Sequence, residues 1–382
     1  MALILARMSP SHKGVMVLTH KEMFDLYPEQ RGSRLGRLRS LLRGTPPKLS
    51  GSERSTVLQR ISSLRQGYIV GVHFGWYLPR APQFLNHIDF YMATNSNFNE
   101  SGHILGKQFP LVSADFVPPI FESPEDFERD IDLLGVANNA PYKRLDLFVQ
   151  VASQIFSARS DAKIRLITPK PLVMNRRQIK LERVLNDAVT HLLISHPHAD
   201  FQLIRPDISA MGKGLSHHAV AGFLQRSKVF FLSSQGEGQP KVLHEALVAG
   251  CSVVAFQKLL QHGVDVRVPD SIRFVPSGFE SAGVLTALTE WPEGRANQSV
   301  LNEALAERNS VQRLLAFLET LAGKGLAFES IPPLSLALPA HSPSGMPWLE
   351  FKDDRATSDL HDFGEWERFL KFAEIDGDVS EH

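Results

Sequence analysis

The sequence predicts an α/β protein of two domains, the second of which contains a parallel sheet with helices on both faces. Its 382 residues are enough for two domains, and a hydrophobic content of 43% can fill two cores. From residue 132 onward, apolar runs of strand length alternate with helical patterns, which is typical of a parallel sheet with helices on both faces. A third observation is the segment 229–256, VFFLSSQGEGQPKVLHEALVAGCSVVAF, which reads as strand, loop, helix and strand.

The second half of the chain supplies most of the predicted elements. We expect strands at residues 132–136, 164–168 and 201–205, ahead of the segment 229–256. Helices are expected at residues 144–158, 176–195 and 218–225. The first of these helices is predicted from apolar residues that recur at helical spacing, namely Leu145, Phe148, Val151, Ala152 and Ile155.

The remaining residues define the domain boundaries. Residues 1–128 are expected to form the first domain, with strands at 14–19, 68–74 and 88–94, and the extended stretch 116–121 is the predicted hinge. The second domain is expected to cover residues 129–326. Residues 327–382 contain a proline-rich connection and then a helix at 360–373, whose apolar stripe needs a partner surface.

Composition excludes several classes of protein. Lysine and arginine total 41, as do aspartate and glutamate, so no overall positive field attracts nucleic acid. The single cysteine, Cys251, excludes a disulfide framework and a cysteine-based zinc site. No run approaches the roughly 20 apolar residues that span a bilayer, and Arg7 interrupts the short apolar run at the N-terminus. These observations predict a cytoplasmic protein.

The loop inside the segment 229–256 has the features of an anion site. Gly236 and Gly238 permit a ligand to approach the backbone closely. Pro240 and Lys241 lead into a helix whose N–H groups and positive dipole end favour a phosphate.

Two carboxylates accompany this loop. Glu237 lies in the loop, and Glu245 is expected in the first turn of the helix, so both would lie at the carboxyl end of a parallel strand. A carboxylate near a helix start fits the dipole and can accept hydrogen bonds from both hydroxyls of a ribose. The alternative is a glycine-rich turn with a glutamate near a helix start and no ligand.

Three stretches carry a resemblance to a known family. Residues 237–247, EGQPKVLHEAL, resemble the signature of family 4 glycosyltransferases, as do the residues after them up to Ala255. Residues 135–152, GVANNAPYKRLDLFVQVA, resemble the start of that family's donor domain, and residues 219–234 resemble the helix and strand before its glutamate loop. The resemblance implies the GT-B fold, in which two Rossmann-like domains face each other across a cleft. It also implies retaining transfer from a nucleotide diphosphate sugar, linked to UDP or GDP.

The resemblance assigns roles to individual residues. Lys143 would bind the donor phosphates, Glu237 the donor sugar, and Glu245 the ribose, while His73 would approach the sugar from the first domain. Solvated charge and a structural histidine are the alternatives for Lys143 and His73. No metal is expected, and the C-terminal helix is expected to pack back on the first domain. The rest of the expected donor-binding set is Arg144, Gly236, Gly238, Gln239, Pro240, Lys241, Val242 and Leu243.

The sequence departs from the family pattern in three places. Val136 stands where family members have an arginine, Arg144 stands where they have a glycine, and the first domain is reduced, with no obvious glycine-rich loop after its first strand. The main expectation is an enzyme of surface polysaccharide or glycolipid synthesis that acts on a carbohydrate or lipid-linked acceptor. The alternative is a catalytically reduced GT-B protein that serves as a binding or scaffold subunit of a polysaccharide assembly complex.

An arginine-rich segment suggests one further partner. If residues 31–43 form a helix, they present a cationic face beside an apolar one, which can bind an anionic membrane surface. An ordinary docked surface helix is the alternative. The arginines are Arg31, Arg34, Arg37, Arg39 and Arg43.

Overall fold

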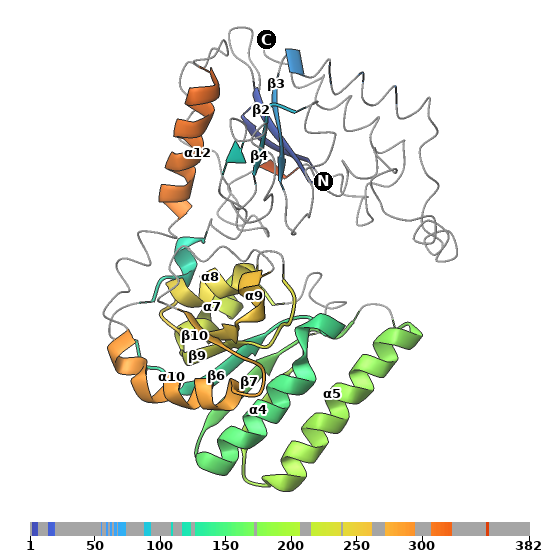
Figure 1. The fold of residues 1–382 in the computed structure, drawn as a ribbon, viewed down its shortest axis with the longest axis vertical. Helices are drawn as coiled ribbons and strands as arrows, with labels where there is room; N and C mark the ends of the chain where they lie inside the picture. Colours follow the sequence, from blue (N-terminus) through green and yellow to red (C-terminus); the bar gives the residue numbers. More distant parts are fainter. Residues whose placement is uncertain are drawn as a thin grey trace. The chain divides into compact units, whose positions relative to one another are not determined.

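The structure is a computed structural model, and Figure 1 shows it as a ribbon. It describes residues 2–6, 14–19, 55, 59, 62, 65–66, 68–73, 88–92, 108–109, 117–123, 127–171, 174–206, 215–237, 240–261, 272–294, 307–322 and 349–350. The chain divides into two compact units. Unit 1 comprises residues 1–113 with residues 311–382, and unit 2 comprises residues 114–310.

Unit 2 contains a six-stranded sheet in which every pair of neighbouring strands is parallel. The strand order is β11-β10-β9-β6-β7-β8, which is the order of a Rossmann sheet with its reversal between β6 and β9. The strands expected from the sequence in this region are confirmed as β6 Ile131–Val136, β7 Lys163–Ile167, β8 Asp200–Ile204, β9 Ser227–Leu232 and β10 Ser252–Phe256. The sixth strand, β11 Ile272–Val275, was not expected.

Helices cover both faces of this sheet (Figure 1). Helix α4 contacts α5 and α10, and α7 contacts α8, so the helices form two groups. Side chains cap two of the expected helices, since Asn175 accepts from the backbone N–H of Gln178 at the start of α5, and Ser216 accepts from that of Ala219 at the start of α7. The bounds are η6 Pro119–Phe121, η7 Pro141–Lys143, α4 Leu145–Ala158, α5 Arg176–Ser195, α7 His217–Gln225, α8 Lys241–Val248, α9 Lys258–Gln261 and α10 Glu280–Gly294.

The core of unit 2 positions the loop after β6. Phe148 of α4 is fully buried and stacks on Phe231 of β9, with ring centroids 6.1 Å apart. A Cβ atom on Gly135 of β6 would lie 2.5 Å from the ring of Phe148, so only glycine lets α4 approach the strand this closely. Burial of a phenylalanine side chain contributes roughly 1.5–3 kcal/mol. The start of α4, and with it the end of the preceding loop, is therefore held firmly over β6.

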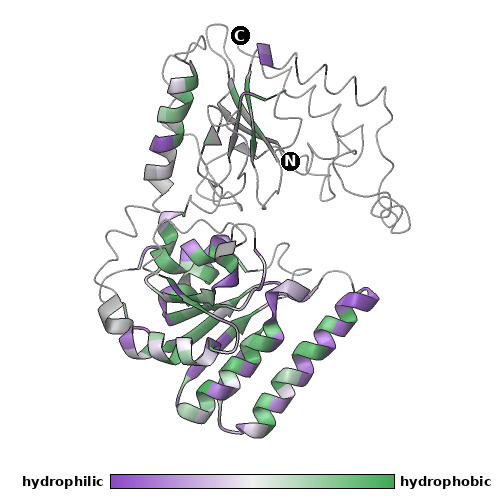
Figure 2. Ribbon diagram, in the orientation of Figure 1, coloured by the Kyte–Doolittle hydropathy of each residue, from purple (hydrophilic) through white to green (hydrophobic). Residues whose placement is uncertain are grey.

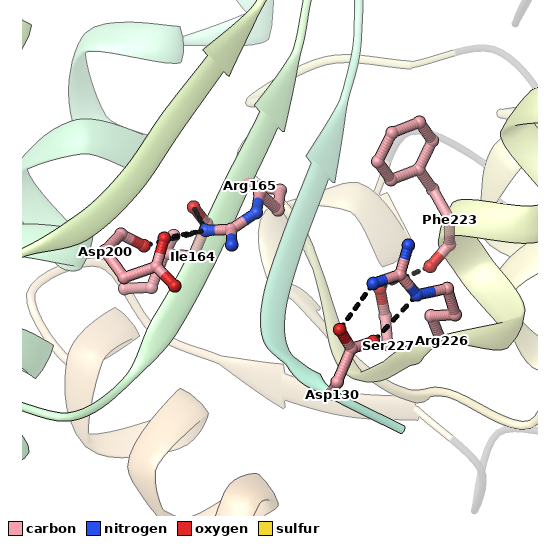
Figure 3. Close-up of polar contacts among 7 residues, drawn as sticks. All are labelled: Asp130, Ile164, Arg165, Asp200, Phe223, Arg226 and Ser227. Carbon is pink, nitrogen blue, oxygen red and sulfur yellow. Dashed lines mark hydrogen bonds and ion pairs between the residues drawn. The ribbon is translucent and has the colours of Figure 1, made fainter. Parts of the chain in front are cut away.

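Polar contacts join neighbouring strands of the unit 2 sheet at the edge formed by their amino ends (Figure 3). Arg226 pairs with Asp130, so the residues that precede β9 and β6 are joined at the amino ends of these strands. Arg165 of β7 donates to the backbone carbonyl of Asp200 at 2.8 Å and pairs with its carboxylate. The hydrogen bond from Arg226 lowers the pKa of Asp130. The carboxyl ends of the strands form the other edge of the sheet, which is where doubly wound sheets bind their ligands.

Unit 1 has a second six-stranded sheet, of order β12-β1-β2-β3-β4-β5. The strands from β2 to β5 are parallel, and β1 is antiparallel to both of its neighbours. The three expected strands are confirmed as β2, β3 and β4, whereas β1 was not expected. Phe317 of α12 packs on Phe90 and Phe109, with ring centroids 5.9 Å and 5.1 Å away. The bounds are β1 Ala2–Ala6, β2 Gly14–Thr19, β3 Tyr68–His73, β4 Phe90–Met92, β5 Gln108–Phe109, β12 Leu349–Glu350 and α12 Glu307–Ala322.

Several expectations concern residues that the structure does not describe. The arginine-rich segment 31–43, the proline-rich stretch 330–347 and the helix expected at 360–373 all lie outside the described residues. The boundaries expected near residues 128 and 326 stay predictions, because residues 124–126 and 323–348 lie outside them too. Among the helices that are described, none is long and apolar enough to cross a membrane.

Candidate functional site

The candidate site lies where the order of the unit 2 sheet reverses. Strands β6 and β9 are parallel neighbours, so the loops that follow them leave the sheet side by side at its carboxyl edge. Lys143 is the last residue of η7 in the first loop, and Glu237 lies in the second. Ligands of doubly wound sheets bind in the crevice at this reversal.

Three contacts join the two loops. The Nζ atom of Lys143 forms an ion pair with Oε1 of Glu237. Ser233 Oγ donates to the backbone carbonyl of Lys143 at 2.7 Å, and the backbone N–H of Gln235 donates to that of Tyr142 at 2.8 Å. The structure therefore brings together two of the residues that the sequence singled out, although 94 positions separate them along the chain.

The ion pair is largely shielded from solvent. The side chains of Lys143 and Glu237 are 15% and 6% exposed. The Nζ atom of Lys143 also lies 5.3 Å from the ring centre of Tyr142. Burial, with the charge of Glu237 as a second cause, raises the pKa of the Tyr142 hydroxyl. From this position, the ammonium group of Lys143 can exchange the carboxylate of Glu237 for a ligand phosphate while it stays shielded from bulk water.

Glu245 lies one turn later in α8 than the sequence led us to expect. Helix α8 begins at Lys241, after the extended backbone of Pro240 (φ −73°, ψ 101°), and its first turn holds no acidic residue. Glu245 is consequently in the second turn, and the expectation of a first-turn carboxylate was wrong. The helix begins at Lys241 as expected, but a turn holds only 3.6 residues, so the fifth residue of the helix already lies beyond the first turn.

Glu245 is buried, with only 9% of the residue exposed. Burial raises the pKa of its carboxyl from 4.5 to about 7, and the charge of Lys241 opposes the rise. The carboxylate thus ionises near neutral pH. When ionised, it can accept hydrogen bonds from two vicinal hydroxyl groups.

The backbone around the start of α8 leaves room for a ligand. A Cβ atom on Gly236 would meet nothing within 4 Å, and Gly236 is not among the residues with positive φ. The backbone N–H of Leu243 donates to the carbonyl of Pro240 at 3.0 Å. Lys241 and Val242 form the rest of the helix start, half-buried. Gly238 and Gln239 lie outside the described residues.

Arg144 has an unusual backbone conformation. Its φ of 48° and ψ of 50° place it in the left-handed region, which glycine adopts more readily than other residues. Its guanidinium pairs with Asp146 at 3.1 Å. A role in phosphate binding stays a prediction. Val136, at the end of β6, is partly buried.

His73 ends β3 in unit 1. Its side chain lies outside the described part of the chain, so its proposed contact with a donor sugar stays a prediction.

A polar cluster that the sequence did not reveal anchors the β6–α4 loop. Asn139 donates to Glu182 of α5 at 2.6 Å, and Arg205, which follows β8, pairs with the same carboxylate. Gln178 Nε2 donates to the backbone carbonyl of Asn139 at 3.1 Å. Glu182 is buried on the inner face of α5, where the helical pattern calls for an apolar residue. An acidic residue at such a position was the only signal of this cluster in the sequence.

Within the described ranges, no three histidine, cysteine, aspartate or glutamate residues cluster closely enough to hold a metal ion. One hydroxyl is noteworthy. Ser234 Oγ, just after β9, is buried and has no hydrogen-bond partner among the described residues.

Comparison with known proteins identifies the fold. No protein-family model matches the sequence, and no curated protein matches it. Among solved structures, a UDP-forming α,α-trehalose-phosphate synthase from Burkholderia xenovorans is similar with a TM-score of 0.50 at 13% identity, over 83% of this chain and 88% of that one. The pneumococcal O-GlcNAc transferase GtfA, in complex with UDP and GlcNAc, gives a TM-score of 0.46 at 12% identity, over 69% and 54%. TarM gives 0.45 at 12% identity, over 67% and 51%. This chain spans about half the length of the latter two proteins.

The likeness to the synthase shows that the chain has the mixed α/β architecture of the GT-B fold.

Proposed function

We propose that this protein is a retaining glycosyltransferase, which moves a sugar from a nucleotide diphosphate sugar to a carbohydrate or lipid-linked acceptor. The observation that carries the proposal is the meeting of Lys143 and Glu237 at the reversal of a Rossmann sheet in a chain of GT-B fold. A cation and a carboxylate at this point fit the two charges that develop when a glycosyl phosphate bond breaks.

The reaction requires both members of the pair. The bond between the anomeric carbon and the diphosphate oxygen breaks, and the diphosphate leaves with the bonding electrons. Lys143, released from Glu237, neutralises the departing charge together with the start of α8. Glu237 then accepts hydrogen bonds from the sugar and stabilises the positive charge at the anomeric carbon. The acceptor hydroxyl forms the new bond and gives up its proton to the departing phosphate.

Glu245 holds the ribose in this proposal. An ionised carboxylate accepts from both ribose hydroxyls, whereas a protonated one can accept fewer hydrogen bonds. Because burial raises the pKa of Glu245 to about 7, nucleotide affinity should increase as the pH rises from 6 to 8. The variant Glu245→Gln should bind more weakly and lose this dependence on pH.

The donor and acceptor are proposed at the level of class. A UDP- or GDP-linked sugar is the proposed donor, no metal is required, and the product belongs to surface polysaccharide or glycolipid synthesis. Residues 31–43 are proposed to hold the protein on the inner face of an anionic membrane when the acceptor is lipid-linked. The proposed location is the cytoplasm.

Calorimetry with UDP and GDP tests the donor site. Lys143→Ala should weaken binding by roughly 1.5–3 kcal/mol, the range for a hydrogen bond to a charged group. Lys163→Ala is a suitable control, because this exposed lysine begins β7 at the opposite edge of the sheet. Equal affinities for the wild-type protein and Lys143→Ala would remove Lys143 from the site.

A second candidate function follows from Val136, which occupies the family position of a phosphate-binding arginine. A protein with a weaker grip on the diphosphate can bind nucleotide sugars without turning them over. Binding of a nucleotide sugar, with neither hydrolysis nor transfer to any of a panel of acceptors, would favour a binding or scaffold subunit.

A further inference from the structure

The first half of α5 carries four exposed cations. Arg176, Arg177, Lys180 and Arg183 all lie within its first eight residues and are solvent-exposed. Within the described ranges, none of their side chains forms an ion pair or a hydrogen bond. Three of them, Arg176, Lys180 and Arg183, follow the spacing of one outward helix face.

This arrangement is unfavourable for the helix itself. Cations near a helix N-terminus oppose its dipole, and like charges three or four positions apart repel each other. The first turn of α5 contains no acidic residue. Glu182, the only carboxylate among residues 174–185, is buried and already engaged by Asn139 and Arg205. The next carboxylate along the helix, Asp187, is exposed one turn after Arg183, but within the described ranges it forms no ion pair with these cations, so one negative charge faces four positive ones. The charge therefore remains available to an anionic partner outside the chain.

Exposed aliphatic side chains lie among these cations. Met174 is 52% exposed, and Ile179 and Val184 are each 43% exposed. Figure 2 shows the start of α5 as strongly hydrophilic, with apolar residues between the charged ones farther along. Cations interleaved with aliphatic side chains suit a lipid surface, where the charges meet headgroups and the apolar groups enter the interface. Single-stranded nucleic acid would instead call for aromatic side chains to stack on bases.

We infer that the surface formed by Met174, two residues before α5, and by Arg176, Ile179, Lys180, Arg183 and Val184 of α5, here called the α5 patch, docks on an anionic phospholipid bilayer. Helix α5 follows the carboxyl end of β7, so the patch begins at the same edge of the sheet as the loop that carries Lys143. Docking would bring that edge to the bilayer surface. The inference concerns adhesion alone and does not depend on the proposed transfer reaction.

Co-sedimentation of the full chain with vesicles tests this inference. Vesicles of phosphatidylglycerol in phosphatidylcholine should bind the protein, and pure phosphatidylcholine vesicles should bind it far less. The triple variant Arg176→Gln, Lys180→Gln, Arg183→Gln should lower the partition coefficient roughly 100-fold, since each cation at the surface contributes about a fivefold factor. A control triple variant replaces three cations elsewhere, namely the exposed Lys163 and Arg313 and the partly exposed Arg273, which pairs with Glu290. This variant, Lys163→Gln, Arg273→Gln and Arg313→Gln, should retain binding.

Further measurements decide between this inference and its alternatives. Met174→Ser, Ile179→Ser and Val184→Ser together should remove the part of the binding that survives 0.5 M salt, because salt screens only the charges. Equal loss in the patch and control variants, or no preference for anionic vesicles, would overturn the inference.

Binding of duplex DNA but not of vesicles, abolished by the patch variant, would make the patch a nucleic-acid surface instead. UDP affinity, measured on the same patch variant, should be unchanged, which separates this inference from the proposed function.

Discussion

Replacement of Glu245 by glutamine should stabilise the protein at alkaline pH while weakening its affinity for nucleotide. Burial raises the pKa of this carboxyl from 4.5 to about 7 in the folded protein. A raised pKa means that the folded state holds the proton more tightly than the unfolded state does. The resulting stabilisation is fully present below pH 4.5 and is lost as the pH rises through 7. The Glu245→Gln variant cannot ionise at this position, so it avoids that loss.

The magnitude follows from the pKa values. One pKa unit corresponds to about 1.4 kcal/mol, so a rise from 4.5 to about 7 corresponds to on the order of 3 kcal/mol at pH 8. For a domain of this size, about 2–4 °C of melting temperature accompanies each kcal/mol. We therefore expect Glu245→Gln to melt about 6–12 °C above the wild-type protein at pH 8 and at a similar temperature at pH 5.

Thermal unfolding at pH 5 and pH 8, with and without UDP, checks this expectation. Glu128→Gln removes an exposed carboxylate of the same unit and serves as the control. UDP should raise the melting temperature of the wild-type protein more than that of Glu245→Gln, because a ligand stabilises the state that binds it. Parallel changes with pH in the wild-type protein and Glu245→Gln would refute the reasoning, since the buried carboxyl would then contribute nothing to the pH dependence.

The contacts at the site support three more predictions. Calorimetry should show that Lys143→Ala weakens UDP binding whereas Glu237→Gln does not, because the latter releases the cation; weaker binding by both would contradict this. Gly236→Ala should leave the melting temperature unchanged, since its Cβ meets open space, yet reduce UDP affinity by blocking a close approach; unaltered affinity would place the ligand elsewhere. Arg144→Gly should raise stability by about 1 kcal/mol in denaturant unfolding, since glycine adopts the left-handed conformation without strain, and a loss of UDP affinity in that variant would reveal a phosphate contact.

The secondary structure of unit 2 could be read from local pattern. Periodic apolar residues placed α4 and α5, because a helix that packs on a sheet must bury one face at each turn. Short β-branched runs placed the strands for a similar reason, since central parallel strands are buried on both faces. Strand β1 escaped this reasoning. Its short apolar run at the very start of the chain contains no signal for an antiparallel partner, and β2 and β12 supply that partner from elsewhere.

The arrangement of the site could be predicted only in part. The residue types of Lys143 and Glu237 were identified from their loops, but their ion pair depends on the lateral order of β6 and β9, which local pattern does not encode. The pKa of Glu245 depends on how tightly α8 packs, and burial is a property of the whole fold. Asn139 and Glu182 were missed for the same reason, because their contact joins a loop to a separate helix.

The ion pair between Lys143 and Glu237 explains how two largely buried charges can be held at the candidate site. A lysine with only 15% of its side chain exposed would lose much of its hydration, and an unpaired charge in such a place costs several kcal/mol. Glu237 compensates that cost by pairing with the Lys143 ammonium group. A diphosphate brings more negative charge than one carboxylate, so it can replace Glu237 as the partner of Lys143. In the proposed reaction, the displaced carboxylate lies next to the anomeric carbon, where the positive charge develops. The contact between Lys143 and Glu237 thus keeps both charges in place for that reaction.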